Sequence, residues 1–180
     1  MRIIPFMLCL AACGTSEPSA ATKPASAPAV EAPAENETQK GASRVALIAP
    51  DQLTDILGKE SGRVRVFNFW ATWCQPCIAE LPHLSEVASR HPEAEVLLVS
   101  LDHRAVGTPR VKAFLDKQGL SMQSFMLDAE DPASAMLEVY DDFPGAIPIT
   151  LVMDGSGELH KAFHRAITAE ELSEAIQNAS

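Results

Sequence analysis

The stretch Asn68–Pro82, NFWATWCQPCIAELP, places two cysteines two residues apart between an apolar run and a segment with helical spacing. Before it, Arg63–Trp70 alternates and then becomes wholly apolar, as a strand entering a buried sheet does. After it, apolar residues recur with helical spacing up to Arg90, at Ile78, Leu81, Leu84 and Val87. The pattern predicts a strand that runs through the cysteine pair directly into a helix.

This arrangement puts Cys74 at the helix N-terminus, where unpaired backbone N–H groups and the positive end of the dipole favour thiolate over thiol. We therefore expect Cys74 to be a nucleophile. Cys77 lies one turn further on, close enough to close a small disulfide ring and more shielded, which suits a resolving thiol. Trp73 can cover the pair on one side, and Pro76 stiffens the first turn without removing a needed hydrogen bond.

Two other uses of a cysteine pair compete with redox chemistry. A structural disulfide is disfavoured, because a loop of two residues restrains little unfolded-state entropy. Zinc needs about four ligands, and the sequence has no second CxxC and no Cys/His cluster. His160 and His164 are too far apart to share one ion, because the strand expected there would separate them by about 13 Å. We therefore expect no metal site.

Composition narrows the functional classes. The 180 residues include 14 basic and 24 acidic ones, and the net charge of −10 gives no electrostatic footprint for nucleic acid. A hydrophobic content of 47% is enough for one core, so we expect a single compact domain with extensions. We also expect the chain to act as a monomer. Cys9 and Cys13 lie in the N-terminal apolar stretch, so the rest of the chain has one possible pair, Cys74 with Cys77, which excludes a disulfide-rich scaffold.

Residues 1–13 are predicted to be a lipoprotein signal peptide. The apolar run Ile3–Ala12 is too short to span a bilayer roughly 30 Å thick but suits the hydrophobic region of a signal peptide. The ending LAAC resembles the bacterial lipobox, so Cys13 would become the lipid-bearing mature N-terminus. The alternatives are a signal peptide without lipidation and a mis-assigned start. Gly14 stands where Asp would mark retention at the inner membrane, which favours the outer membrane.

Residues 14–43 are predicted to be a disordered tether. They contain four prolines, many alanines and no aromatic residue, too little apolar surface to offset the entropy of ordering. Thirty such residues reach about 30 Å as a random coil. The folded domain is expected to occupy residues 44–180.

Elements alternate along the rest of the chain. Further helices are expected at 50–60, 108–118, 132–140 and 168–179. Asp131 with Pro132 and Thr168 with Glu171 are expected to begin the last two. Further strands are expected at 95–102 and 123–128, followed by a hairpin of 149–154 and 158–164 around GSG. The order predicts an α/β fold with parallel strands and an antiparallel hairpin at the edge.

The run VFNFWATWCQPCIAELPHL, Val66–Leu84, resembles the thioredoxin superfamily. Its extended form WCxPCxxExPxL is similar to the TlpA/ResA group of bacterial extracytoplasmic thiol-disulfide oxidoreductases. The order of VLLVSLD, FMLD and IPITLVMDGSGEL extends the likeness over roughly Val45–Ala175. The resemblance implies a thioredoxin fold, with a central mixed sheet flanked by helices and the strand and helix that this group inserts between the two halves of the fold.

The resemblance also implies roles for individual residues. Cys74 and Cys77 match the redox pair, so no cofactor other than their disulfide is expected. Pro148 matches the cis-proline that faces this disulfide, and Ile147 would pair its backbone with a bound substrate strand; the alternative for Pro148 is a trans proline at the start of an edge strand. Glu80 matches an acidic residue that could exchange protons with Cys77, the alternative being an exposed helix residue.

One further position agrees with the thioredoxin superfamily, and two depart from its pattern. Pro82 matches the kink in the superfamily's active-site helix. Thioredoxin has a buried Asp at the position of Asn68, so Glu80 or water would have to accept the proton here. The TlpA group has Thr after the cis-proline, whereas this chain has Ile149 and then Thr150, which is expected to alter the rim of the substrate groove.

We therefore expect a periplasmic, membrane-anchored thiol-disulfide oxidoreductase that reduces disulfides of client proteins, for example in cytochrome c maturation. Its other partner would be a thiol electron donor in the membrane. The alternative is a copper-binding chaperone on the same fold, because two thiolates can bind Cu(I). That class has a wider cysteine spacing and a distal His ligand, and His83 would sit on another face of the helix.

Overall fold

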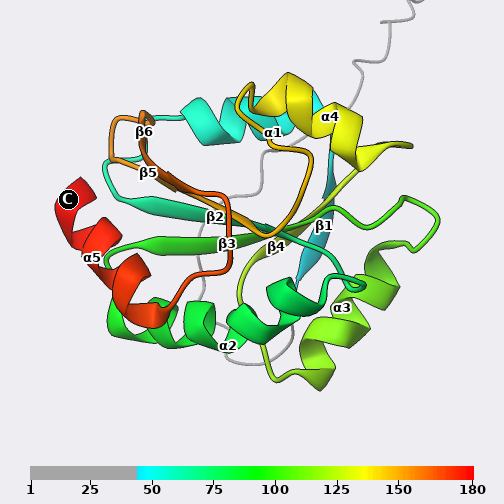
Figure 1. Ribbon diagram of the computed structural model, residues 1–180, viewed down its shortest axis with the longest axis horizontal. Coiled ribbons are helices and arrows are strands. Elements are labelled where there is room, and N and C mark those ends of the chain that lie inside the picture. The colour runs from blue at the N-terminus through cyan, green and yellow to red at the C-terminus, as the bar shows by residue number, and fades with distance from the viewer. Residues whose placement is uncertain (1–43) are drawn as a thin grey trace, which may run out of the picture. The chain divides into compact units, whose positions relative to one another are not determined.

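A six-stranded mixed sheet is the centre of the computed structural model, which describes residues 44–180 (Figure 1). Its strands are β1 Val45–Ile48, β2 Arg65–Trp70, β3 Glu95–Ser100, β4 Ser124–Leu127, β5 Ile149–Met153 and β6 Leu159–Phe163. The helices are α1 Pro50–Gly58, α2 Gln75–Arg90, α3 Thr108–Lys117, α4 Pro132–Val139 and α5 Ala169–Ala179. The signal peptide, Cys13 and the tether, all predicted for residues 1–43, lie outside the described residues.

The strand order β1-β4-β3-β2-β5-β6 places β2 inside the sheet. β2 pairs in parallel with β3 and antiparallel with β5, and β5 and β6 form the antiparallel hairpin at one edge. All six residues of β2 are buried, and four of them are apolar, as expected for a strand that is covered on both faces. The mixed sheet, the thioredoxin-like fold and the hairpin edge are confirmed.

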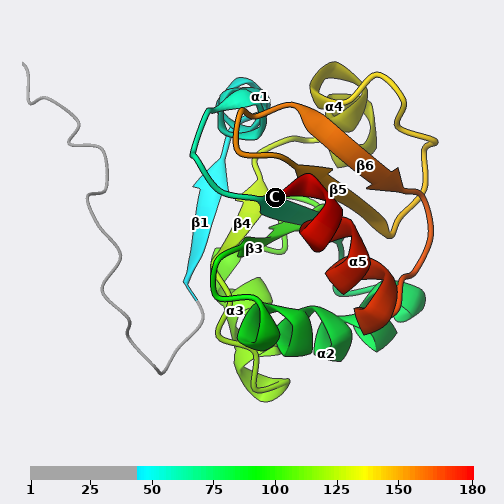
Figure 2. The same cartoon turned by 90° about the vertical axis from the view of Figure 1, so that its left-hand side faces the viewer.

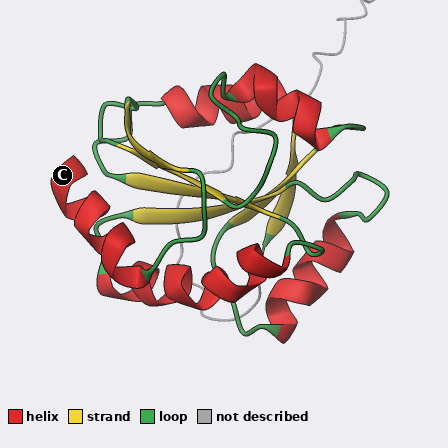
Figure 3. Ribbon diagram, viewed as in Figure 1, coloured by secondary structure: helices red, strands yellow, loops and turns green. Residues whose placement is uncertain are grey.

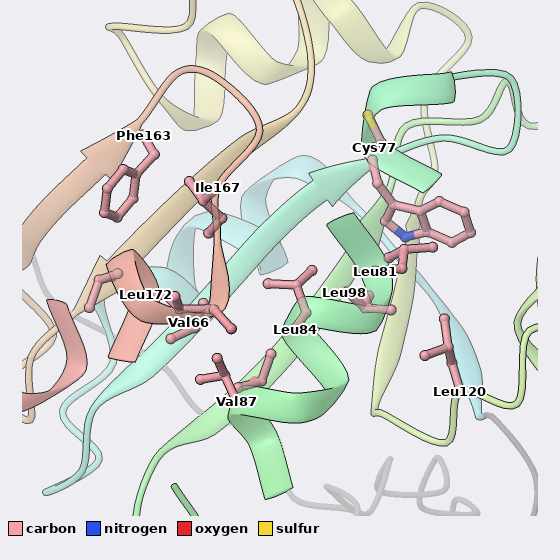
Figure 4. Close-up of a cluster of buried hydrophobic side chains, with 14 of the residues drawn as sticks. Val66, Cys77, Leu81, Leu84, Val87, Leu98, Leu120, Phe163, Ile167 and Leu172 are labelled. Atoms are coloured by element: carbon pink, nitrogen blue, oxygen red, sulfur yellow. The ribbon is translucent and has the colours of Figure 1, made fainter. Parts of the chain in front are cut away.

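Helices cover both faces of the sheet (Figures 1 and 2). α2, α3 and α5 pack on one face, where their apolar residues form a core with alternate residues of β2 such as Val66 and Trp70. Figure 4 shows Leu81, Leu84 and Val87 from α2 in this core. α1 and α4 pack on the other face against the remaining residues of β2.

The helix starts follow the capping residues of the sequence. Thr168 Oγ1 accepts a hydrogen bond from the backbone N–H of Glu171 at 3.3 Å, and the Glu171 carboxylate accepts one from Thr168 N–H at 3.0 Å. Asp131 caps α4 by accepting from Ala133 N–H at 3.2 Å. Gly119, with φ of +70°, follows the end of α3 in the left-handed conformation that glycine adopts without steric cost.

β1 is the element that the sequence pattern did not reveal. This strand has four residues, and within residues 44–180 it lies at the edge of the sheet, paired with β4; Leu47 is 52% exposed there. Such a short and half-exposed strand has neither the apolar run of a central strand nor a clear alternation. Within residues 44–180, the helices are too short or too polar to cross a bilayer.

Candidate active site

Cys74 and Cys77 lie where β2 leads into α2 and are joined by a disulfide with a Cα–Cα distance of 5.3 Å. Cys74 is the N-cap of α2, and its Sγ accepts a hydrogen bond from the backbone N–H of Cys77 at 3.3 Å. In the reduced pair this N–H and the helix dipole would stabilise a thiolate on Cys74. Cys74 is 5% exposed and Cys77 fully buried, as Figure 4 shows for Cys77 beside the apolar core.

Trp73 and Pro76 flank the pair on the surface. Trp73, expected to cover the cysteines, is 65% exposed, which leaves an aromatic surface beside Cys74 open to solvent. Pro76 lies in the first turn of α2, where its missing N–H costs no helical hydrogen bond. Pro82 lies within α2, which continues past it to Arg90.

The Ile147–Pro148 peptide bond is cis, as the resemblance implies, and it leads into β5. The loop from α4 to this bond is drawn in green in Figure 3. The Ile147 carbonyl oxygen lies 3.8 Å from Cys74 Sγ. The structure thus places the cis-proline segment directly against the first cysteine, although the two are 73 residues apart in the sequence.

Glu80 is 2% exposed, so it is a buried carboxylate rather than an exposed helix residue. Its Oε1 accepts a hydrogen bond from Asn68 Nδ2 at 2.8 Å, and its Oε2 accepts one from Ile167 N–H at 2.9 Å. Burial raises the pKa of Glu80 above its ordinary value, while the hydrogen bonds from Asn68 and Ile167 and the nearby His83 oppose this shift. The carboxyl group is held firmly in a region where its charged form is disfavoured.

The Asn68 side chain connects Glu80 to the sheet. Its Nδ2 also donates to Thr150 Oγ1 at 2.9 Å, and the two residues are direct neighbours across β2 and β5. Both are fully buried. Asn68, Glu80 and Thr150 therefore form a polar cluster inside the core on the α2 side of the sheet.

The expected effect of Ile149 on the groove rim is wrong. Ile149 is fully buried and packs with the apolar residues on the α1 and α4 side of the sheet. Neighbouring strand residues point to opposite faces, so Thr150 and not Ile149 faces Asn68. That alternation is a signal that could have identified Thr150 as part of the site. Ile167 donates its backbone N–H to Glu80 from the loop before α5, and the sequence holds no signal for this contact.

The three histidines that were considered as metal ligands contact other parts of residues 44–180 or solvent. His83 Nδ1 lies 3.2 Å from the Ile167 carbonyl oxygen, and His164 Nε2 lies 3.1 Å from the hydroxyl of Tyr140. His160 is exposed on β6. Among residues 44–180, no three His, Cys, Asp or Glu side chains are grouped so that they could hold a metal ion.

Comparison with known proteins shows which family the sequence belongs to. The sequence matches the AhpC/TSA family over residues 26–163, a match that begins within the segment predicted to be the tether. It is 29% identical over 150 residues to the thiol-disulfide oxidoreductase ResA of Geobacillus kaustophilus, covering 78% of this chain and 81% of ResA. It is 37% identical over 108 residues to a thiol:disulfide interchange protein DsbE homolog of Paracoccus denitrificans, covering 60% of this chain and 54% of that protein.

A solved structure has the same fold. A thiol:disulfide interchange protein of the thioredoxin family from Chlorobium tepidum TLS superposes with a TM-score of 0.56 at 22% identity, covering 70% of this chain and 83% of that one. The sequence match to the family spans more than half of the chain. The chain therefore belongs to the AhpC/TSA family, and it has a thioredoxin-like fold.

Proposed function

We propose that this thiol-disulfide oxidoreductase reduces disulfide bonds of client proteins in the periplasm, while a lipid on Cys13 holds it at a membrane. The observation that carries the proposal is the position of Cys74. It caps α2, forms a disulfide with Cys77 and contacts the segment before Pro148. A nucleophilic thiol, a resolving thiol and a backbone edge beside them are what the exchange of disulfides requires.

The reaction begins with the reduced pair. The Cys74 thiolate attacks one sulfur of the client disulfide, which forms a mixed disulfide and releases the other client sulfur as a thiolate that takes up a proton. The Cys77 thiolate then attacks Cys74 Sγ, which breaks the mixed disulfide and releases the second client thiol. Two electrons pass from the pair to the client, and the Cys74–Cys77 disulfide remains. In this proposal the two thiols carry both electrons, so no further cofactor takes part.

Glu80 is proposed to accept the proton of the Cys77 thiol before the second step. The two residues are three apart on α2 and therefore neighbours on the helix. Cys77 is fully buried, so bulk water cannot easily serve as its base. The raised pKa of Glu80 favours this role, because a general base works best when its pKa approaches the working pH.

The exposed surface beside the pair is proposed to receive the client. Trp73 offers an apolar contact next to Cys74, and the backbone of Ile147 can pair with an extended client segment. The cysteines of apocytochromes c are candidate clients, on the strength of the resemblance to the TlpA/ResA group. A thiol donor in the membrane would restore the reduced pair, and we propose that the chain acts as a monomer.

The location of the protein is part of the same proposal. The apolar run before Cys13 and the LAAC sequence favour export and lipidation, and Gly14 favours the outer membrane. Mass spectrometry of the membrane-extracted protein would show a lipid on Cys13. A mature protein that begins elsewhere and carries no lipid would contradict the anchor, although not the redox chemistry.

Trapping of the mixed disulfide tests the reaction. Cys77→Ser should keep the nucleophile but lose the resolving step, so a covalent complex with a disulfide-bonded client such as insulin should accumulate on a non-reducing gel. Cys74→Ser is the matched control and should form no complex. A complex that forms equally through Cys77 in the Cys74→Ser variant would contradict the assigned order of attack.

A further inference from the structure

Asp102 follows β3 and has a fully buried carboxylate that none of the steps above uses. Its Oδ1 accepts a hydrogen bond from the hydroxyl of Thr72 at 2.6 Å, and its Oδ2 accepts one from Thr72 N–H at 3.0 Å. Ser100 Oγ also donates to Oδ2, at 2.7 Å. Both oxygens of this carboxylate are therefore directed at Thr72, which lies two residues before Cys74.

The segment that Asp102 binds is the turn that delivers Cys74 to α2. Cys74 N–H donates to the Ala71 carbonyl oxygen at 3.0 Å, which closes this turn around Thr72. At its base, Leu101 N–H donates to the Trp70 carbonyl oxygen at 2.7 Å. The ends of β2 and β3 are thus joined twice, once through the backbone and once through the carboxylate.

A buried carboxylate is a costly way to join two strands, because its charge must be removed from water. Thr72 and Ser100 supply donors that offset this cost, and the ion pairs described for residues 44–180 do not include Asp102. The backbone bond between Leu101 and Trp70 already holds the strands together. The carboxylate adds a second attachment, which is made to the Thr72 turn.

We propose that Asp102 is a positioning residue for the redox pair, and that through Thr72 it holds Cys74 as the N-cap of α2. We call these two residues the Thr72–Asp102 clamp. The clamp keeps Cys74 Sγ within 3.3 Å of the Cys77 N–H, the donor that stabilises a thiolate in the reduced pair. This inference rests on the proposed function, because it concerns the same two cysteines.

The direct test changes the hydroxyl of Thr72 and leaves Asp102 in place. Thr72→Val has nearly the same shape but cannot donate to Asp102 Oδ1, whereas Thr72→Ser can. Thr54→Val is the matched control, because Thr54 Oγ1 donates to the Pro50 carbonyl oxygen in α1, at 3.1 Å and away from the cysteines. Each full-length variant is reduced, and the rate at which iodoacetamide modifies Cys74 is measured between pH 5 and 9.

We expect Thr72→Val to lower the modification rate at pH 6 by about threefold to tenfold, since a weakened hydrogen bond to the thiolate leaves less thiolate at that pH. The midpoint of its pH profile should move to higher pH. The equilibrium constant with glutathione should shift toward the disulfide by a similar factor, because the thiolate of the reduced form is less stabilised. Thr72→Ser and Thr54→Val should behave like the wild-type chain.

Three results would contradict the proposal that the Thr72–Asp102 clamp positions Cys74. The first is a folded Thr72→Val variant with the wild-type pH profile. The second is equal slowing in Thr72→Ser, which would assign the effect to side-chain size. The third is faster modification in Asp102→Asn with no change in Thr72→Val, which would mean that the charge of Asp102 acts alone. A wild-type chain that exchanges no disulfide with glutathione would instead contradict the proposed function.

Discussion

Arg65 and Glu80 are two charged side chains buried on opposite faces of the sheet, and their surroundings differ in kind. Arg65 is 3% exposed at the start of β2 and donates to the carbonyl oxygens of Ile56, Leu57 and Lys59 at the end of α1. Glu80 lies on α2, beside the cysteines, and accepts from Asn68 and Ile167. The Arg65 guanidinium satisfies carbonyl groups at the end of α1, whereas the Glu80 carboxyl group can gain or lose a proton.

The difference comes from how each charge is balanced. A cation at the C-terminus of α1 meets the negative end of the helix dipole and the carbonyl groups that lack helical partners. Burial lowers the pKa of Arg65, but an arginine stays protonated in proteins. Burial raises the pKa of Glu80 toward the pH range in which thiols exchange. The same sheet therefore holds one structural charge and one that can serve chemistry.

Arg65→Met should have the largest effect on stability. The substitution leaves three carbonyl groups at the end of α1 without their donor, and the free energy of unfolding should fall by roughly 2–4 kcal/mol. Urea denaturation measures this loss. Arg63→Met is the matched control, since exposed Arg63 also donates to two carbonyl groups and should cost less than about 1 kcal/mol.

The same Arg65→Met variant should leave thiol exchange unchanged at temperatures where it is folded. If its cysteines react several-fold more slowly than in the wild-type chain while the fold is intact, Arg65 also takes part in thiol exchange. The assignment of Arg65 to the fold and Glu80 to the chemistry would then be wrong.

Glu80→Gln should slow thiol exchange strongly and change stability little. Without a base beside Cys77, resolution of the mixed disulfide should slow by about 10²-fold, the usual contribution of a positioned general base. Stability should change by only about 1 kcal/mol, because one hydrogen bond is lost while the cost of burying a charge is removed. Rapid-quench analysis of the mixed disulfide gives the rate. Glu86→Gln, on the exposed part of α2, should react like the wild-type chain.

The raised pKa of Glu80 should make the free energy of unfolding depend on pH, with a smaller effect than the two substitutions above. The pKa of Glu80 is higher in the folded chain than its ordinary value of 4.5, so the folded state holds this proton more tightly than the unfolded state. The stabilisation that Glu80 contributes is complete below pH 4.5 and is lost as the pH rises through its raised folded pKa. The free energy of unfolding of the wild-type chain should therefore decrease, relative to Glu80→Gln, above pH 4.5.

Urea denaturation of the two chains across pH 4 to 8 measures this difference. A wild-type chain that instead gains stability relative to Glu80→Gln over this range would show that the hydrogen bonds to the carboxylate outweigh its burial.

Much of the fold could be predicted from the sequence, because its central elements have strong local patterns. The buried run of β2, the helical spacing after Cys77 and the capping residues of α5 each identify an element without tertiary information. β1 could not be recognised, because four residues at a sheet edge depend on their pairing with β4. The cysteine pair was predicted for the same local reason.

The surroundings of the pair could be predicted only in part. Glu80 was predicted through the resemblance, from its place three residues after Cys77. Its hydrogen bonds come from Asn68 and from a backbone N–H 87 residues away. Asp102 was seen only as the end of a predicted strand. Its contact with Thr72 arises because β2 and β3 end side by side, which the sequence does not show locally. Long-range polar contacts were the part that needed the structure.

The reduction potential of the Cys74–Cys77 pair tests the central claim most directly. The full-length chain would be equilibrated in glutathione or dithiothreitol buffers, and the reduced fraction would be read by thiol trapping. Reference values run from about −270 mV for thioredoxin to about −120 mV for the oxidant DsbA. A client reductant should have a potential at or below about −230 mV, whereas a value above about −180 mV would contradict that role and indicate an oxidase or isomerase.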